Sequence, residues 1–256
     1  MRITGPGQAI FALGFAVIGA LSVGWHGFAP GWELLPKWLP WRNTLFIPYG
    51  ALLLASGVAL LIPPTAKPAA FALAVLLLIR LLLLHVPRVA MHPLIEAVWE
   101  SMGENIIYLG GAWTIFSLLP GRSGILAKFG NVRAGQIVFA LATPGIGLSH
   151  FFYLNMTAPL IPSWLPFHVP LAYFTGAAWI AGGLGIFFGV LPRLAATLLA
   201  IMVSLFTLMI WVPAVIATPA NLSDWTEICS SVAITGAAWT VAESLRGRSW
   251  SFARDR

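Results

Sequence analysis

Long apolar runs, separated by short polar or proline-rich stretches, dominate the chain. A helix needs about 20 apolar residues to cross a bilayer core about 30 Å thick. None of the runs alternates as a strand does, and backbone groups in lipid must be satisfied within a helix or a closed barrel. The pattern therefore predicts an all-α integral membrane protein with eight transmembrane helices. They are expected near residues 8–28, 45–63, 68–87, 98–118, 134–153, 169–190, 194–213 and 225–244.

The sequence also repeats itself at an offset of 126 residues. Between residues 38–118 and the segment 126 residues later, 22 of 81 positions are identical without a gap. The matches include prolines and tryptophans, which an apolar composition alone would not align. We predict two four-helix units, residues 1–121 and 134–256, joined by a basic linker at 122–133. An even number of helices per unit makes them a parallel repeat.

Composition and charge place these helices in a membrane and set their orientation. The chain is 59% hydrophobic and 9% charged, outside the averages of about 45–50% and about 25% for soluble domains. Ten Lys and Arg residues fall on one side of the predicted topology and three on the other, so both termini are predicted to be cytoplasmic, in a bacterial inner membrane. The net charge of +6 forms no basic stripe with aromatics, which argues against nucleic acid.

Scarce ionisable residues gather between the third and fourth predicted helices. Arg80 and Glu104 each lie about 10 Å below the outer interface at 1.5 Å per residue, and a charge at that depth needs a partner or water. They form either a structural ion pair or one wall of an outer-side polar pocket. The candidate ligand-binding residues are Arg80, His85, Arg88, His92, Glu100, Glu104, Tyr108 and His26.

The residue spacing supports part of this set of candidate ligand-binding residues but does not identify a cofactor. Glu100, Glu104 and Tyr108 follow one another at four-residue intervals and share one stripe of a helix. A metal site at His85, His92 and Glu96 lacks any ligand-motif spacing, and haem held by His26 with another histidine is also disfavoured. The chain has one cysteine, so it holds neither a CxxC pair nor an iron–sulfur cluster by itself.

The second predicted unit lacks most of these groups. At the 126-residue offset, Arg80 corresponds to Phe206, His85 to Trp211 and Glu104 to Ser230. We interpret the first unit as the carrier of the polar site and the second mainly as scaffold. Three residues of the second unit remain candidates to contribute across the interface: His150, Tyr173 and Glu227.

Several motifs resemble those of a known family. The sequence HVPRVAMHP at residues 85–93 is followed by Trp99 and by GGAW at residues 110–113, after a glycine-rich first helix. This pattern resembles the DoxX-like family of four-helix membrane proteins, here as a tandem duplication. Some members are subunits of quinol oxidase or thiosulfate:quinone oxidoreductase complexes. The resemblance implies a four-helix unit and a link to quinone-level redox chemistry, and it assigns no catalytic residue.

Two functional hypotheses follow, and neither decides whether the protein is an enzyme. In the first, the protein is a redox-associated subunit or accessory of a respiratory complex, and its outer-side pocket binds a quinone headgroup or a small anion. In the second, it is a non-enzymatic, lipid-binding subunit that packs against a larger membrane complex. Quinone is the favoured cofactor, and the expected partners are membrane lipids and other subunits.

Overall fold

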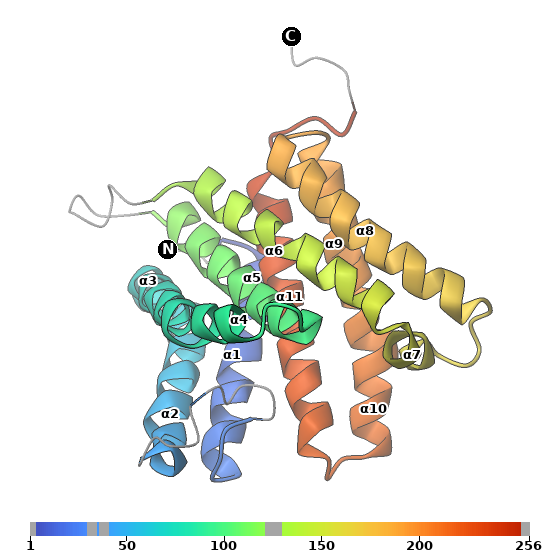
Figure 1. The fold of residues 1–256 in the computed structure, drawn as a ribbon. Coiled ribbons are helices and arrows are strands. Elements are labelled where there is room, and N and C mark those ends of the chain that lie inside the picture. The colour runs from blue at the N-terminus through green and yellow to red at the C-terminus, as the bar shows by residue number, and fades with distance from the viewer. Residues whose placement is uncertain (1–3, 30–34, 36–40, 121–129, 252–256) are drawn as a thin grey trace.

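The computed structural model describes residues 4–29, 35, 41–120 and 130–251, and throughout these ranges the regular elements are helices (Figure 1). The predicted all-α class is therefore confirmed. Most of the linker at 122–133 and the last five residues of the basic tail lie outside the described residues. The main helices are α1 (Pro6–Gly24), α2 (Arg42–Leu61), α3 (Pro63–Arg80), α5 (Glu96–Leu118), α6 (Val132–Phe152), α8 (His168–Phe188), α9 (Pro192–Phe206) and α11 (Leu222–Ser244).

Six helices of the described chain are long and apolar enough to cross a membrane. Four are α1, α2, α6 and α8; the other two are continuous rods formed by α3 with the segments after it, and by α9 with the segments after it. The remaining predicted spans, α5 and α11, have 23 residues each and enough length, but they are less apolar. Both have many buried residues and pack on other helices. A helix shielded from lipid by protein can carry polar side chains.

Helix bounds in the two halves differ by the same 126 residues as the sequence matches. Residues 96–118 form α5 and residues 222–244 form α11. Shorter elements follow the same rule: the π-helices η1 (Leu81–His85) and η4 (Thr207–Trp211), and the short helices α4 (Val86–Met91) and α10 (Val212–Ala217). The local conformation thus has the same period as the sequence.

A proline accounts for the π-helical turn in each half. Pro87 and Pro213 are the second residues of α4 and α10, directly after η1 and η4. Proline has no N–H to give to the carbonyl four residues earlier, and its ring collides with that carbonyl in a regular α-helix. A wider π-helical turn relieves this collision while the rod continues. The proline repeated in the sequence therefore marks a repeated bulge.

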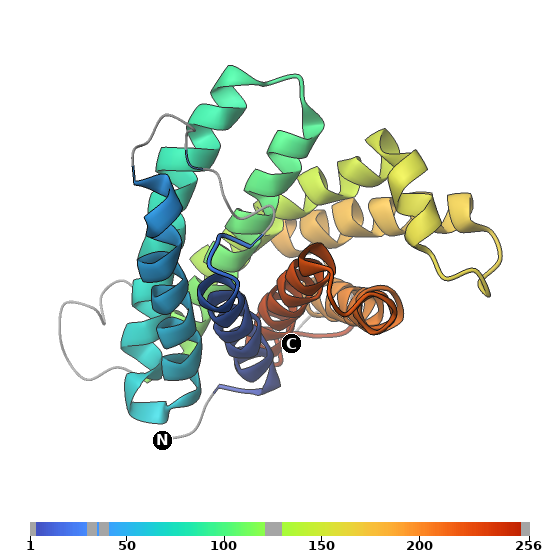
Figure 2. The same cartoon turned by 90° about the horizontal axis from the view of Figure 1, so that it is seen from below.

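The two halves pack together through the first and last long helices of each half, which pack on helices of the other half. In chain order the eight long helices form a ring, in which each packs on the next and α11 packs back on α1. Consequently α1 of the first half packs along α11 of the second, and α6 of the second half packs along α5 of the first (Figures 1 and 2). Helices α5 and α11 also pack on each other across the ring.

Glycines allow the closest approach at both junctions between the halves. A Cβ atom on Gly236 of α11 would collide with the backbone of Phe11 in α1. At the other junction, a Cβ atom on Gly110 of α5 would lie 2.5 Å from the backbone nitrogen of Phe139 in α6. Gly110 and Gly236 are themselves 126 residues apart. Small residues of this kind let helix backbones pack closely in membranes.

The repeated tryptophans fasten the turn before the last helix of each half. Trp99 Nε1–H donates to the Pro93 carbonyl at 3.0 Å, and Trp225 Nε1–H donates to the Pro219 carbonyl at 2.9 Å. We expect Trp99→Phe and Trp225→Phe each to lower stability by about 1 kcal/mol, the typical net value of one hydrogen bond. Thermal unfolding in detergent measures this, and equal stability of both variants and wild type would contradict it.

Candidate functional site

A large cavity lies among helices of the second half, with a contribution from α5. It has a volume of about 1040 Å³ and is lined by α6, α8, α9, η4 and α11 and by two residues of α5. Helices α8 and α9 are joined by a short turn and separate from it toward α7 (Leu154–Thr157) and α10 (Figure 1). Gly189, with φ of 73°, ends α8 in this turn. The cavity occupies the space between the diverging helices.

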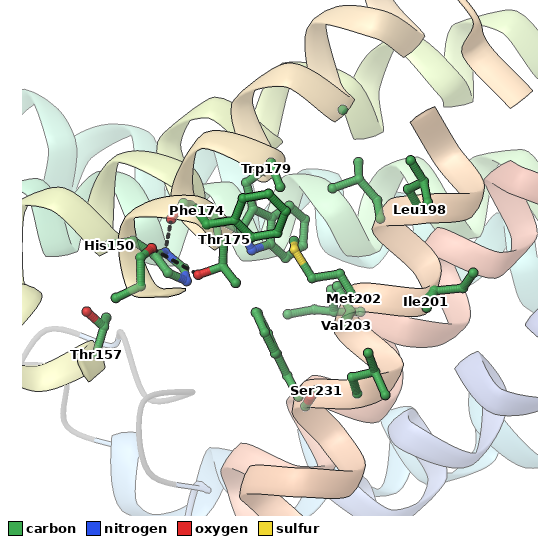
Figure 3. Close-up of a pocket in the computed structure, with 18 of the residues that line it drawn as sticks. His150, Thr157, Phe174, Thr175, Trp179, Leu198, Ile201, Met202, Val203 and Ser231 are labelled. Carbon is green, nitrogen blue, oxygen red and sulfur yellow. Dashed lines mark hydrogen bonds between the residues drawn. The ribbon is translucent and has the colours of Figure 1, made fainter. Parts of the chain in front are cut away.

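Most of the cavity wall is apolar. Leu198, Ile201, Met202 and Val203 approach it from α9, and Phe174 approaches it from α8 (Figure 3). Several small residues of α8 also line it, which keeps side-chain volume out of the space. This part of the wall suits an apolar chain or ring system, because binding one removes its surface from water.

Carboxylates from two helices make part of the wall acidic. Glu100 and Glu104 lie one turn apart on α5, and Glu227 lies on α11. Gly103 lets α5 approach α6 beside them, since a Cβ there would lie 3.3 Å from the Ala142 carbonyl oxygen. The charge of Glu227 acts on Glu104, and that of Glu100 acts on both. The two central helices therefore bring three like charges to one cavity.

A histidine and hydroxyl groups complete the polar part of the wall. His150 Nδ1 lies 3.0 Å from the Ile146 carbonyl oxygen, which can only accept, so Nδ1 carries a proton and Nε2 is the ring atom left for a ligand. Ser231 shares a 2.7 Å hydrogen bond with Thr207. Thr157 also lines the cavity (Figure 3). These groups offer both donors and acceptors.

Trp179 contributes a donor that the protein leaves unused. Its side chain is 2% exposed and lines the cavity from α8 (Figure 3). The indole Nε1–H has no hydrogen-bond partner among the described residues. Leaving a buried donor unsatisfied costs about 1–3 kcal/mol. An acceptor on a bound molecule would recover that cost.

Arg80 lies behind the acidic wall and is not itself a lining residue. It is 6% exposed, and its Nη1–H donates to Asn105 Oδ1 at 3.4 Å. Asn105 Nδ2–H in turn donates to the Leu77 carbonyl at 3.0 Å. The charge of Arg80 also acts on Glu104. The predicted Arg80–Glu104 pair thus interacts electrostatically, with Glu104 on the cavity side.

The other predicted residues are distributed around the first half. Tyr108 is fully buried and packs edge-on against Phe15, 5.5 Å between ring centroids. His85 is 1% exposed, and its Nε2 has no hydrogen-bond partner within the described chain. Arg88, His92 and His26 are exposed and do not line the cavity. Of the eight candidate residues, the structure therefore brings Glu100 and Glu104 to the cavity and Arg80 to the back of its wall.

The metal candidates do not form a site in the part of the chain that is described. Glu96, at the first position of α5, has both carboxylate oxygens buried without a hydrogen-bond partner. No group of three His, Cys, Asp or Glu side chains in the described ranges is arranged to hold a metal ion. His85, His92 and Glu96 are not such a group.

The second half was predicted to be mainly scaffold, yet its helices enclose this cavity. The sequence carried only weak indications that residues of this half line a cavity. Phe206 and Trp211, which replace Arg80 and His85 at the repeat offset, both line the cavity. Of the three second-half residues named as contributors, His150 and Glu227 line it, whereas Tyr173 does not. Trp179 carried no signal, because a tryptophan in an apolar run is normally a packing residue.

Comparison of this chain with protein families, with curated proteins and with solved structures finds no match. The resemblance to the DoxX-like family therefore remains a prediction from the motifs.

Proposed function

We propose that this chain is a multi-pass membrane protein that binds a lipid-like molecule in the cavity. The apolar part of the molecule would lie along α8 and α9, and its polar end would meet Glu100, Glu104, Glu227 and His150. The observation that carries this proposal is one cavity of about 1040 Å³ with an apolar wall and a concentrated polar patch. Ligand pockets of a few hundred to about 1000 Å³ typically combine these features.

Membrane topology belongs to the same proposal. We take α5 and α11 as two further crossings, which makes eight, because the apolar helices around them separate their polar side chains from lipid. The two halves would then be related as a parallel repeat, with both termini and the basic loops in the cytoplasm of a bacterial cell. The exposed apolar side chains of α2, α3 and α9 would contact lipid.

A quinol is the redox-active ligand that would fit the same cavity. Its isoprenoid chain would occupy the apolar wall, and its hydroxyls would donate to Glu104 or to His150 Nε2. Trp179 Nε1–H favours this second candidate, because it can donate to a carbonyl of the oxidised form. A small free anion is disfavoured here, since three carboxylates would repel it. Extraction of purified protein, with chromatography for quinones, tests this candidate directly.

Filling the cavity tests the main proposal. Ala181 lines the cavity on α8, and Ala55 is its counterpart at the repeat offset on α2; both side chains are exposed. We expect Ala181→Trp to weaken binding of a fluorescent alkyl alcohol about tenfold or more, because the indole displaces the chain, which loses about 0.8 kcal/mol per excluded methylene. Ala55→Trp should bind the probe as wild type does.

Fluorescence titration of the protein in nanodiscs gives the affinities. Absence of saturable binding to the wild type would remove the basis of the proposal. An equal loss of affinity in Ala55→Trp and Ala181→Trp would place the probe outside the cavity.

A further inference from the structure

The acidic part of the cavity carries more negative than positive charge. Glu100, Glu104 and Glu227 interact with one another, and Asp224 adds its negative field to Glu227. Among the described residues, the cation that acts on this group is Arg80, and it acts on Glu104. With all three carboxyl groups ionised, they and one guanidinium would carry a net charge of minus two. Carboxyl groups this close together are neutralised either by protons or by a further cation, and a bound cation would favour their ionised form.

The rest of the wall suits a cation that carries an apolar body. Phe174, Trp179, Phe206 and Trp211 line the same cavity, and aromatic faces attract ammonium groups most strongly where water is excluded. Met202 and Leu198 add apolar surface on α9. A bare metal ion would leave this surface unused.

Trp179 supplies an independent indication of a ligand. Trp179 lines the cavity, and its Nε1–H is buried and has no acceptor within the described residues. A carbonyl or ether oxygen on the bound molecule would satisfy it. A ligand that matches this wall therefore carries one acceptor oxygen in addition to a positive charge.

We infer, on the basis of the binding function proposed above, that the ligand is a lipophilic amine: an apolar body with an ammonium head and a nearby acceptor oxygen. Glu100, Glu104 and Glu227 bind the ammonium, and Trp179 binds the oxygen. Two sources carry this chemistry, an aminophospholipid of the bilayer and a free amphipathic amine.

Three fluorescent probes with the same alkyl chain and different heads test the charge preference. We expect the alkylamine to bind about tenfold or more tightly than the alkyl alcohol, and the fatty acid to bind most weakly, because a charge-assisted hydrogen bond exceeds a neutral one. Equal binding of amine and alcohol overturns the inference and leaves the cavity as a lipid site. If none of the probes binds, the proposed function fails as well.

Neutral variants identify the groups responsible. Glu227→Gln keeps the side-chain shape, and because Glu227 is exposed at the cavity it carries little folding risk. We expect Glu227→Gln and Glu100→Gln to reduce the ratio of amine to alcohol affinity about threefold to tenfold each. Glu243→Gln, near the other end of α11 and away from the cavity wall, is the matched control and should keep the wild-type ratio. An unchanged ratio in both cavity variants overturns the assignment.

Native mass spectrometry separates the two sources. Protein extracted from mixed phosphatidylethanolamine and phosphatidylglycerol membranes would retain the former selectively if the ligand is an aminophospholipid. Retention of neither lipid, together with tight alkylamine binding, indicates a free amine. Selective retention of phosphatidylglycerol contradicts the inference.

Discussion

Gly236→Ala is expected to destabilise the protein by about 2 kcal/mol or more, because one methyl group would be forced into the backbone of Phe11 at the α1–α11 junction. Without that contact, the same change inside a helix would stabilise it by about 0.5–1 kcal/mol. The effect should be large because this junction holds the first half on the second. Thermal unfolding in detergent, followed by size-exclusion chromatography, measures the loss of folded protein.

Gly145 provides the matched control for this substitution. It lies within α6, and a Cβ there would have the Trp99 carbonyl oxygen, at 4.0 Å, as its nearest neighbour. Gly145→Ala should therefore unfold at the wild-type temperature or above it. If the Gly145 and Gly236 variants were equally stable, the two halves would not depend on the close approach of α1 and α11.

Asn105→Leu is expected to cost about 3 kcal/mol, the range seen when a buried charged network loses a partner. Asn105 is fully buried and links the Arg80 guanidinium to the Leu77 carbonyl. Leucine has a similar size and offers neither the acceptor for Arg80 nor the donor for Leu77. Equilibrium unfolding in mixed detergent measures the change.

The repeat offers an internal comparison for this prediction. Ser231 takes the position of Asn105 in the second half, where it shares a hydrogen bond with Thr207. Ser231→Ala removes a neutral hydrogen bond and should cost about 1 kcal/mol. A smaller loss for Asn105→Leu than for Ser231→Ala would show that Asn105 does not support the Arg80 charge.

The two halves place different chemistry at equivalent positions. Arg80 and His85 of the first half are buried polar groups, whereas Phe206 and Trp211 in the second half line the cavity. Tyr49 and Thr175 form a further such pair: Thr175 lines the cavity, and the Tyr49 hydroxyl is buried. One half thus surrounds Arg80 with buried polar side chains, while the other leaves room for a ligand next to the same central helices.

Local features of the site were readable from spacing alone. Glu100 and Glu104 are four residues apart in a predicted helix, so they had to share a face, and both line the cavity. Burial of Arg80 followed from the cost of a charge in lipid, and it is observed. Arg88, His92 and His26 were predicted in the same pocket, but they do not line the cavity. The prediction assumed that residues near one another along the chain are also close in space. The path of the chain after each helix end instead carries these three residues away from the cavity.

Hydropathy, proline placement and the 126-residue repeat predicted where the long helices lie to within a few residues, because helix positions depend on neighbours along the chain and on the medium. The π-helical turns η1 and η4 were found only in the structure. Six of the eight expected spans meet the length and hydropathy requirement. Only the tertiary structure shows that α1 packs on α11 and α6 on α5, and that α8 diverges from α9. These arrangements depend on which backbones can approach at Gly110 and Gly236 and on the volume left between helices. Packing between distant segments sets both quantities, so the cavity that unites Glu104, Glu227 and Trp179 exists only in the folded chain.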